Sequence, residues 1–277
     1  MQSVVIQGKA EYVVTQLVGK FPDFNVYICQ SKEGIEYLLK IAREQSVNGL
    51  LDREAFILAA LAEEMKERDE VFKRETGSEH GHGYRRCIPS LVETLVAKTQ
   101  SNRRVNVLSI YGADSMRDLV PLLQYRTREK VRIDPKTSAW VMGRLLKILT
   151  LTQPFGVTLG ALDGENIVIN SSKHHVTLFD WTRATLTPGA LSTKAAKAEI
   201  ALVAREIILA LGGSLEKRRL PQSPQLTDTR YADLLFSFAS GGSSNPFTAG
   251  EQFYELLDQL WESGFHEFTT YPINQGD

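Results

Sequence analysis

Two oxygen-bearing side chains, Asn166 and Asp180, stand at the two ends of a pattern that predicts a β-hairpin. Ile167–Asn170 and Val176–Phe179 are short apolar runs, and residues 171–175 between them are polar. Such runs around a short polar turn favour two paired strands. The hairpin would bring an amide and a carboxylate together, and oxygen ligands of this kind suit a hard cation such as Mg²⁺. Asn and Asp are also ordinary turn and cap residues, so the pair by itself leaves both interpretations open.

The residues around this hairpin resemble the catalytic loop and metal-binding motif of protein kinases, H-R-D-x-x-x-x-N followed by D-F-G. Residues 159–166 stand in the place of the first motif, and Asp180-Trp181-Thr182 in the place of the second. The resemblance implies that Asn166 and Asp180 bind the Mg²⁺ that accompanies ATP. The family's base aspartate is replaced by Ala161, whose methyl group cannot accept a proton from a substrate hydroxyl.

Asp163 is the candidate catalytic residue that remains in this loop. It lies two residues after Ala161, and residues two apart in an extended segment point the same way. A carboxylate there would be able to orient a hydroxyl or accept its proton. Asp163-Gly164 is also typical of a plain turn. The triplet Leu159-Gly160-Ala161 resembles the His-Gly-Ala variant found in a branch of bacterial and phage kinase-like proteins.

Residues 11–42 predict three strands of an antiparallel meander, and the first link resembles the kinase Gly-rich loop G-x-G-x-x-G-x-V. Gly19 and Val26 match that pattern, whereas Phe21 and Phe24 occupy the other glycine positions. The glycines let backbone N–H groups approach phosphates closely. We therefore expect the phenylalanines to block that approach or to fold into the cleft.

Lys40, at the end of the third strand, resembles the V-A-I-K lysine that contacts the α- and β-phosphates. Leu38 lies on the same face as Lys40, where it would narrow the adenine region. Glu54 falls on the apolar stripe of a helix expected from Arg53 to about Lys73, with Asp52 as its N-cap. The resemblance implies that Glu54 pairs with Lys40.

Two further strands, Ile88–Lys98 and Arg104–Tyr111, complete an expected five-stranded antiparallel sheet with one helix. The break at Gly112–Ser115 resembles the hinge between kinase lobes. The resemblance implies further nucleotide contacts from Ser109, Ile110, Tyr111 and Val168.

The chain after the hinge predicts mainly helices. Asp134 followed by Pro135 indicates a helix start, and Thr248-x-x-Glu251 is typical of a capping box that opens the final helix. Glu199, on an amphipathic helix expected over Lys197–Leu211, stands where kinases carry an aspartate that braces the catalytic loop. The expected fold class is α+β: one bilobal protein-kinase-like domain, with residues 1–111 as the N-lobe and 112–277 as a mainly helical C-lobe.

Composition excludes several classes of partner. The 277 residues carry a net charge of −1, which does not favour nucleic acid or an anionic membrane. Apolar runs are interrupted by charge before they reach membrane-spanning length, and no leader pattern opens the sequence. Cys29 and Cys87 have neither disulfide nor metal spacing, which favours a reducing compartment, so the expected location is cytoplasmic.

Three functions compete on this scaffold. Ala161, the two phenylalanines and Leu38 favour a pseudokinase, a binding or regulatory module for an unknown protein partner, with ATP and Mg²⁺ as candidate ligands. An active atypical Ser/Thr protein kinase and a small-molecule phosphotransferase, each using Asp163, are the alternatives. Phosphoryl transfer is largely positioning and electrostatics, so loss of the base does not exclude them.

Overall fold

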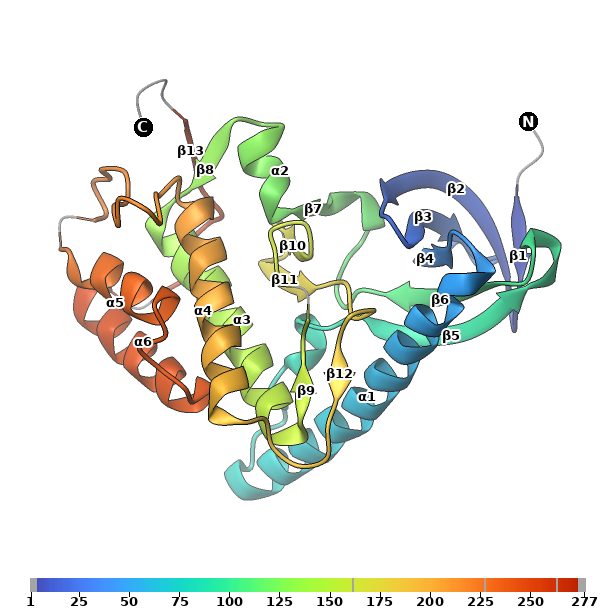
Figure 1. Cartoon of the computed structure of the whole chain (residues 1–277), viewed down its shortest axis with the longest axis horizontal. Helices are drawn as coiled ribbons and strands as arrows, with labels where there is room; N and C mark the ends of the chain where they lie inside the picture. The colour runs from blue at the N-terminus through green and yellow to red at the C-terminus, as the bar shows by residue number, and fades with distance from the viewer. Residues whose placement is uncertain (1–3, 161, 227, 263, 274–277) are drawn as a thin grey trace. The chain divides into compact units, whose positions relative to one another are not determined.

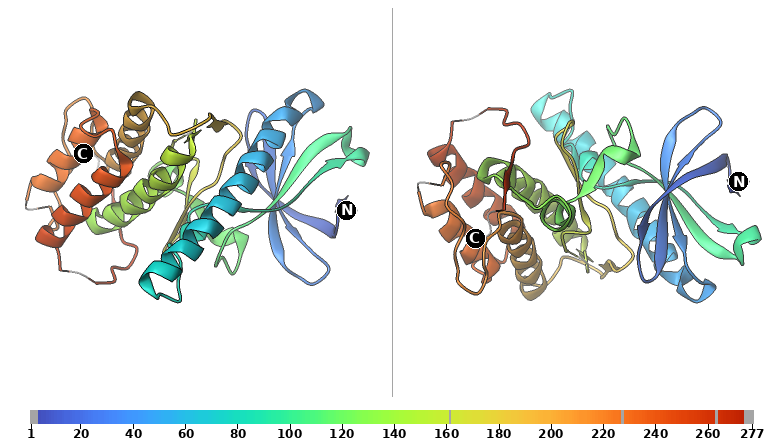
Figure 2. Two further views of the ribbon diagram at one scale, coloured as in Figure 1. Left: turned by 90° about the horizontal axis from the view of Figure 1, so that it is seen from below. Right: turned by 90° about the horizontal axis from the view of Figure 1, so that it is seen from above.

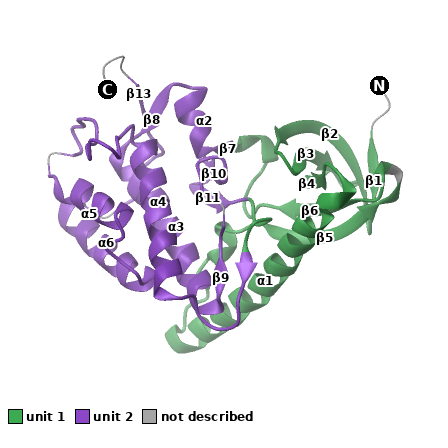
Figure 3. Cartoon of the chain, in the orientation of Figure 1, with its two compact units in different colours: residues 1–119, 180–184 green, residues 120–179, 185–277 purple. Residues whose placement is uncertain are grey.

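The computed structural model describes residues 4–160, 162–226, 228–262 and 264–273, and the chain divides into two compact units (Figure 3). Unit 1 comprises residues 1–119 together with Asp180–Ala184, and unit 2 comprises residues 120–179 and 185–277. The expected hinge near residue 112 stays a prediction, since this division falls after Leu119 and assigns Asp180–Ala184 to unit 1. Each unit is described by itself.

Unit 1 is built on an antiparallel sheet in the order β1-β2-β3-β4-β6-β5 (Figure 1). The sequence predicted five of these strands. The sixth in the described chain is β1, a three-residue edge strand whose central residue, Ile6, is buried. The strands are β1 (Val5–Gln7), β2 (Glu11–Lys20), β3 (Phe24–Gln30), β4 (Glu36–Ala42), β5 (Ser90–Ala97) and β6 (Arg103–Ser109).

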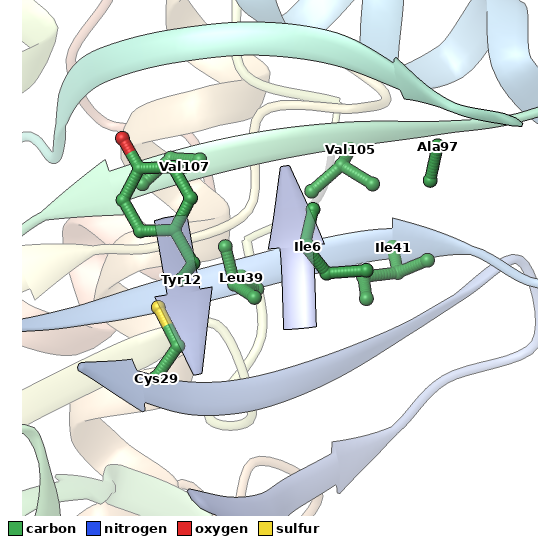
Figure 4. Close-up of a cluster of buried hydrophobic side chains, with 8 residues drawn as sticks. All are labelled: Ile6, Tyr12, Cys29, Leu39, Ile41, Ala97, Val105 and Val107. Atoms are coloured by element: carbon green, nitrogen blue, oxygen red, sulfur yellow. The ribbon is translucent and has the colours of Figure 1, made fainter. Parts of the chain in front are cut away.

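One face of this sheet closes on a small apolar core to which all six strands contribute (Figure 4). Because side chains alternate along a strand, Leu39 and Ile41 of β4 enter this core while Leu38 and Lys40 point to the opposite face. Burial of this face removes apolar surface from water and fixes the register of β4. The core residues are Ile6, Tyr12, Cys29, Leu39, Ile41, Ala97, Val105 and Val107.

The opposite face is covered by α1 (Asn48–Thr76), a single long helix that packs against β4, β5 and β6 (Figure 2). Asp52 was expected to cap this helix, and that prediction was wrong. The helix begins one turn earlier, after Val47, which makes no side-chain cap bond. Fully buried Leu51 holds this first turn against the sheet, and Asp52 instead forms an ion pair with Arg104 at 2.6 Å.

Unit 2 is mainly helical, with three small sheets. The central helix α3 starts as predicted: Asp134 accepts hydrogen bonds from the N–H groups of Lys136 and Thr137, and Pro135 opens the first turn. Helix α3 packs against α4 and α6, and α4 packs against α5. The helices are α2 (Leu122–Thr127), α3 (Pro135–Phe155), α4 (Thr193–Ala210), α5 (Arg230–Ala239) and α6 (Pro246–Leu260).

The strands of unit 2 include the hairpin that the sequence predicted, β10 with β11. A third strand, β7, completes that sheet, while β12 pairs with β9 and β13 with β8. Their bounds are β7 (Leu119–Pro121), β8 (Val131–Ile133), β9 (Val157–Thr158), β10 (Ile167–Asn170), β11 (His175–Leu178), β12 (Thr185–Leu186) and β13 (Thr270–Pro272). Among the helices that the structure describes, none combines the length and apolar character needed to cross a bilayer.

The start of α6 also differs from the expected capping box at Thr248. Asn245 is the N-cap, and its side-chain oxygen accepts from the N–H groups of Phe247 and Thr248. Pro246 takes the first helical position, for which its fixed φ and missing N–H are suited. The helix therefore starts before Thr248, which lies within its first turn.

Candidate functional site

The candidate site in unit 1 is centred on Lys40. Its ammonium lies 2.5 Å from Glu54 Oε1 and 2.7 Å from Asp180 Oδ1. The side chains of Lys40 and Glu54 are fully buried, and that of Asp180 is 14% exposed. The ion pair that the sequence led us to expect between Lys40 and Glu54 is therefore present, and Asp180 joins it.

The elements around Lys40 fix its position. The side chains of β4 alternate between the two faces of the sheet, so Lys40 points toward α1. The buried residues of α1 include Glu54. Asn106 of β6, which lies opposite Lys40 in register, donates to Glu54 Oε2 and to the Leu51 carbonyl, each at 2.9 Å. The N–H of Trp181 donates to Glu54 Oε1 at 3.1 Å. Both carboxylate oxygens of Glu54 are thus paired, which offsets the cost of burying the charge.

Asp180 is held by its own segment as well as by Lys40. The N–H of Thr182 and its hydroxyl both donate to Asp180 Oδ1, at 3.1 and 2.8 Å. Burial by itself raises the pKa of Asp180, but Lys40 and Thr182 outweigh it and hold that pKa below its ordinary value. Asp180 is consequently an anion at neutral pH, the form in which a carboxylate binds a metal ion.

Two residues of this cluster were missed by the sequence reasoning. Asn106 is a lone polar residue within the apolar strand Val105–Leu108, and that pattern would have indicated a buried hydrogen-bonding role. Thr182 replaces the glycine of the D-F-G motif, and its hydroxyl is available as a second donor to Asp180.

An aromatic side chain of the Gly-rich-loop region, Phe24, covers Lys40. The ring centroid of Phe24 lies 4.3 Å from Lys40 Nζ, and only 3% of Phe24 is exposed. Phe21 stacks on Phe24 with centroids 4.8 Å apart. Gly19 faces the Phe21 ring so closely that a Cβ at this position would lie 2.8 Å from it. Phe24 therefore lies over the lysine that, in the kinase resemblance, contacts phosphates, and Phe21 stacks on Phe24.

The remaining nucleotide-contact candidates of unit 1 stay predictions. In the register of the sheet, Val26 of β3 lies opposite Gly19 of β2 and Lys40 of β4. Leu38 of β4 is buried and lies opposite Ile28 of β3 and Leu108 of β6. Ser109 ends β6, followed by buried Ile110 and by Tyr111, which is 50% exposed.

In unit 2, Asn166 and Asp163 lie in the loop that enters β10. Asp163 Oδ1 accepts from the N–H groups of Glu165 and Asn166, each at 3.0 Å, so this carboxylate holds the turn. The Asn166 carbonyl accepts from the N–H of Phe179 at 3.0 Å, and Asp180 follows directly in the chain. Asn166 and Val168 are buried. Ala161 lies outside the described residues.

Two glutamates of α4, Glu199 and Glu206, accept hydrogen bonds from backbone N–H groups of this loop. Glu199 accepts from the N–H of Leu159 at 2.5 Å, which is the brace expected from the kinase resemblance. Burial raises the pKa of Glu199 to about 7, partly opposed by that hydrogen bond. Burial and the nearby Asp163 also raise the pKa of Glu206, against the Gly164 N–H and Arg126.

Asp180 in unit 1 is an anionic carboxylate and Asn166 in unit 2 is an amide, so each is of the residue types whose oxygens suit a hard cation. That the two bind one Mg²⁺, which would neutralise phosphate charge, stays a prediction. Lys40 fits the phosphates of a nucleotide less well because its ammonium lies 4.3 Å from the centroid of the buried Phe24 ring. Its ion pair with Glu54 does not argue the same way, since active kinases also require that pair.

Neither a protein-family model nor a curated protein sequence matches this chain. Solved structures do match. The chain is similar to vaccinia related kinase 3, with a TM-score of 0.64 at 12% identity over 94% of this chain and 90% of that one. The chain has the protein-kinase fold. It is also similar to the PknI kinase domain of Mycobacterium tuberculosis, with a TM-score of 0.55 at 16% identity over 94% of this chain and 98% of that one. At these identities the likeness establishes the kinase fold and leaves activity to be argued from the residues.

Proposed function

We propose that this kinase-fold chain is a pseudokinase, a binding or regulatory module that transfers phosphate weakly or not at all. The observation that carries the proposal is the burial of Lys40 beneath Phe24, with Glu54 and Asp180 as its partners. A phosphate that is to reach this ammonium must first displace an aromatic ring that is itself buried. The ion pair between Lys40 and Glu54 then serves to join β4 to α1.

The loop residues support the same proposal. The base position is Ala161, and the nearby carboxylate, Asp163, is engaged in holding the turn before Asn166. Asp163 Oδ1 accepts both N–H groups, so this side chain is oriented by its role in the turn. We therefore favour the regulatory module over an active kinase that uses Asp163.

The proposal predicts that ATP binding is weak and depends on a divalent cation held by Asn166 and Asp180. A ligand that binds only the folded state raises the melting temperature by mass action. A thermal-shift titration with ATP, with and without Mg²⁺ or Mn²⁺, should give a small shift for the wild type, and only with metal. Phe24→Ala should enlarge that shift because it uncovers Lys40.

The control is Phe56→Ala, which removes a phenylalanine that is 63% exposed on α1. Phe24→Ala will also lower the melting temperature without ligand, by loss of a buried ring, so the comparison is made between the shifts that ATP causes in each variant. A large wild-type shift that Phe24→Ala leaves unchanged would contradict the covering role of Phe24.

A further inference from the structure

A cavity of about 380 Å³ opens in unit 2 where α4 ends. Arg126 of α2 lines one side of this cavity, and the segment that follows α4, residues 212–221, lines the other. In Figure 1 the segment after α4 lies at the same end of unit 2 as α2 and β8. The cavity is thus formed by two separate parts of the chain.

The lining is predominantly basic. Arg126, Lys217 and Arg219 contribute three positive charges, against the single carboxylate of Glu216. In the described part of the chain, none of these three basic side chains forms one of the observed ion pairs. Arg126 is partly balanced by Glu206, whose pKa it lowers, so Lys217 and Arg219 carry most of the uncompensated charge.

The turn that presents Lys217 and Arg219 is held in one shape. Ser214 and Arg219 exchange two backbone hydrogen bonds at 2.9 and 3.2 Å, and the N–H of Lys217 donates to Ser214 Oγ at 3.1 Å. Between them Arg218 adopts a positive φ of 47°, donates to Ser240 Oγ at 3.1 Å and lies 5.5 Å from the Phe236 ring centroid. A turn held in this way needs no ordering of its backbone on binding, so only the exposed side chains of Lys217 and Arg219 lose conformational freedom.

Capping of α4 does not account for these charges. Basic residues are favoured near a helix C-terminus because they neutralise its exposed carbonyls. Here the carbonyls of Ile207, Ile208 and Leu209 already accept from the backbone N–H groups of the next three residues after the helix, at 2.8–3.0 Å. The basic side chains of the turn are therefore available for a ligand.

We propose that this basic cavity docks an acidic peptide segment of a partner protein. Leu209 and Leu215, the latter 36% exposed, add apolar surface beside the basic groups, which suits a peptide that mixes carboxylates with apolar side chains better than a free anion. The cavity volume also lies in the range of binding pockets. The proposal names the partner chemistry of the regulatory module, so it rests on the proposed function.

The test is fluorescence anisotropy with a labelled peptide of alternating glutamate and leucine, using the full chain. We expect saturable binding that weakens as salt is added, because salt screens exposed charges. Lys217→Glu should weaken binding about tenfold, and Lys217→Glu with Arg219→Glu more than that. Lys194→Glu, at another exposed lysine of unit 2 outside the cavity, is the matched control and should bind as the wild type does.

Equal loss in Lys194→Glu and Lys217→Glu would overturn the proposal, as would equal binding of a peptide in which glutamine replaces glutamate. Absence of saturable binding up to millimolar peptide would also overturn it. Melting temperatures of the variants establish that each is folded. None of these measurements involves nucleotide, so their failure is distinguishable from failure of the pseudokinase assignment.

Discussion

Lys40 occupies the place of the kinase lysine that contacts phosphates, but its surroundings favour a structural role over phosphate contact. Its ammonium is balanced by two carboxylates, one of them fully buried, and by the face of an aromatic ring. Removing one partner of a buried ion pair leaves an uncompensated charge, which is strongly destabilising. At this scale the account assigns Lys40 a structural role.

Lys40→Met should therefore lower the free energy of unfolding by about 3–5 kcal/mol, because Glu54 and Asp180 lose their common cation. Urea unfolding followed by circular dichroism measures the change. Lys32→Met is the control: Lys32 pairs with Glu11 at 2.8 Å but is 69% exposed, and loss of such a solvent-screened pair should leave the free energy of unfolding nearly unchanged. Equal, small effects at both lysines would contradict the structural role.

At the scale of elements, α4 holds the loop before Asn166 through Glu199. The pKa of Glu199 is about 7 in the folded chain against an ordinary value of 4.5. Between these values the folded state binds more protons than the unfolded state, so this residue's contribution to stability falls as pH rises. The folded chain is thus more stable when Glu199 is protonated, because burial disfavours its charge, while the hydrogen bond from the Leu159 N–H favours the anion.

We expect the wild type to lose up to about 3 kcal/mol of unfolding free energy relative to Glu199→Gln between pH 4.5 and 7. The neutral amide keeps an oxygen acceptor for the N–H of Leu159 but does not titrate. Urea unfolding of both proteins across this range gives the difference. If the free energies of unfolding of the wild type and Glu199→Gln differ by the same amount at every pH, Glu199 does not have the raised pKa.

The start of α6 gives a second test at this scale. Asn245→Ala removes the acceptor for two backbone N–H groups and should destabilise the chain by about 1 kcal/mol. Thr248→Ala, three positions later, should change the free energy of unfolding by less than half of that. If the Thr248 substitution has the larger effect in urea unfolding, the capping assignment is wrong.

At the scale of the whole molecule, the sequence predicted the kinase fold and most elements that carry the site. Local patterns were sufficient for β3, β4, the β10–β11 hairpin and the Asp134 cap, because each depends on neighbours in the chain. Asp52 was misassigned as a cap because the true start of α1 depends on tertiary burial of Leu51. The error at Thr248 was different: Asn245-Pro246 is a local signal like Asp134-Pro135, and it was overlooked. The contact of Phe24 with Lys40 could not be predicted from the sequence. The sequence left open whether the ring blocks the approach of phosphates or folds into the cleft.

Measurement of the release and transfer of the γ-phosphate of radiolabelled ATP, with Mg²⁺ or Mn²⁺, decides between a pseudokinase and an active kinase. It compares the wild type with Asp180→Ala, Asp163→Asn and Ala161→Asp. The account predicts that wild-type turnover is no higher than that of Asp180→Ala, and that Asp163→Asn does not change it. Wild-type turnover that Asp180→Ala and Asp163→Asn both abolish would contradict the account and establish an active kinase with Asp163 as its base.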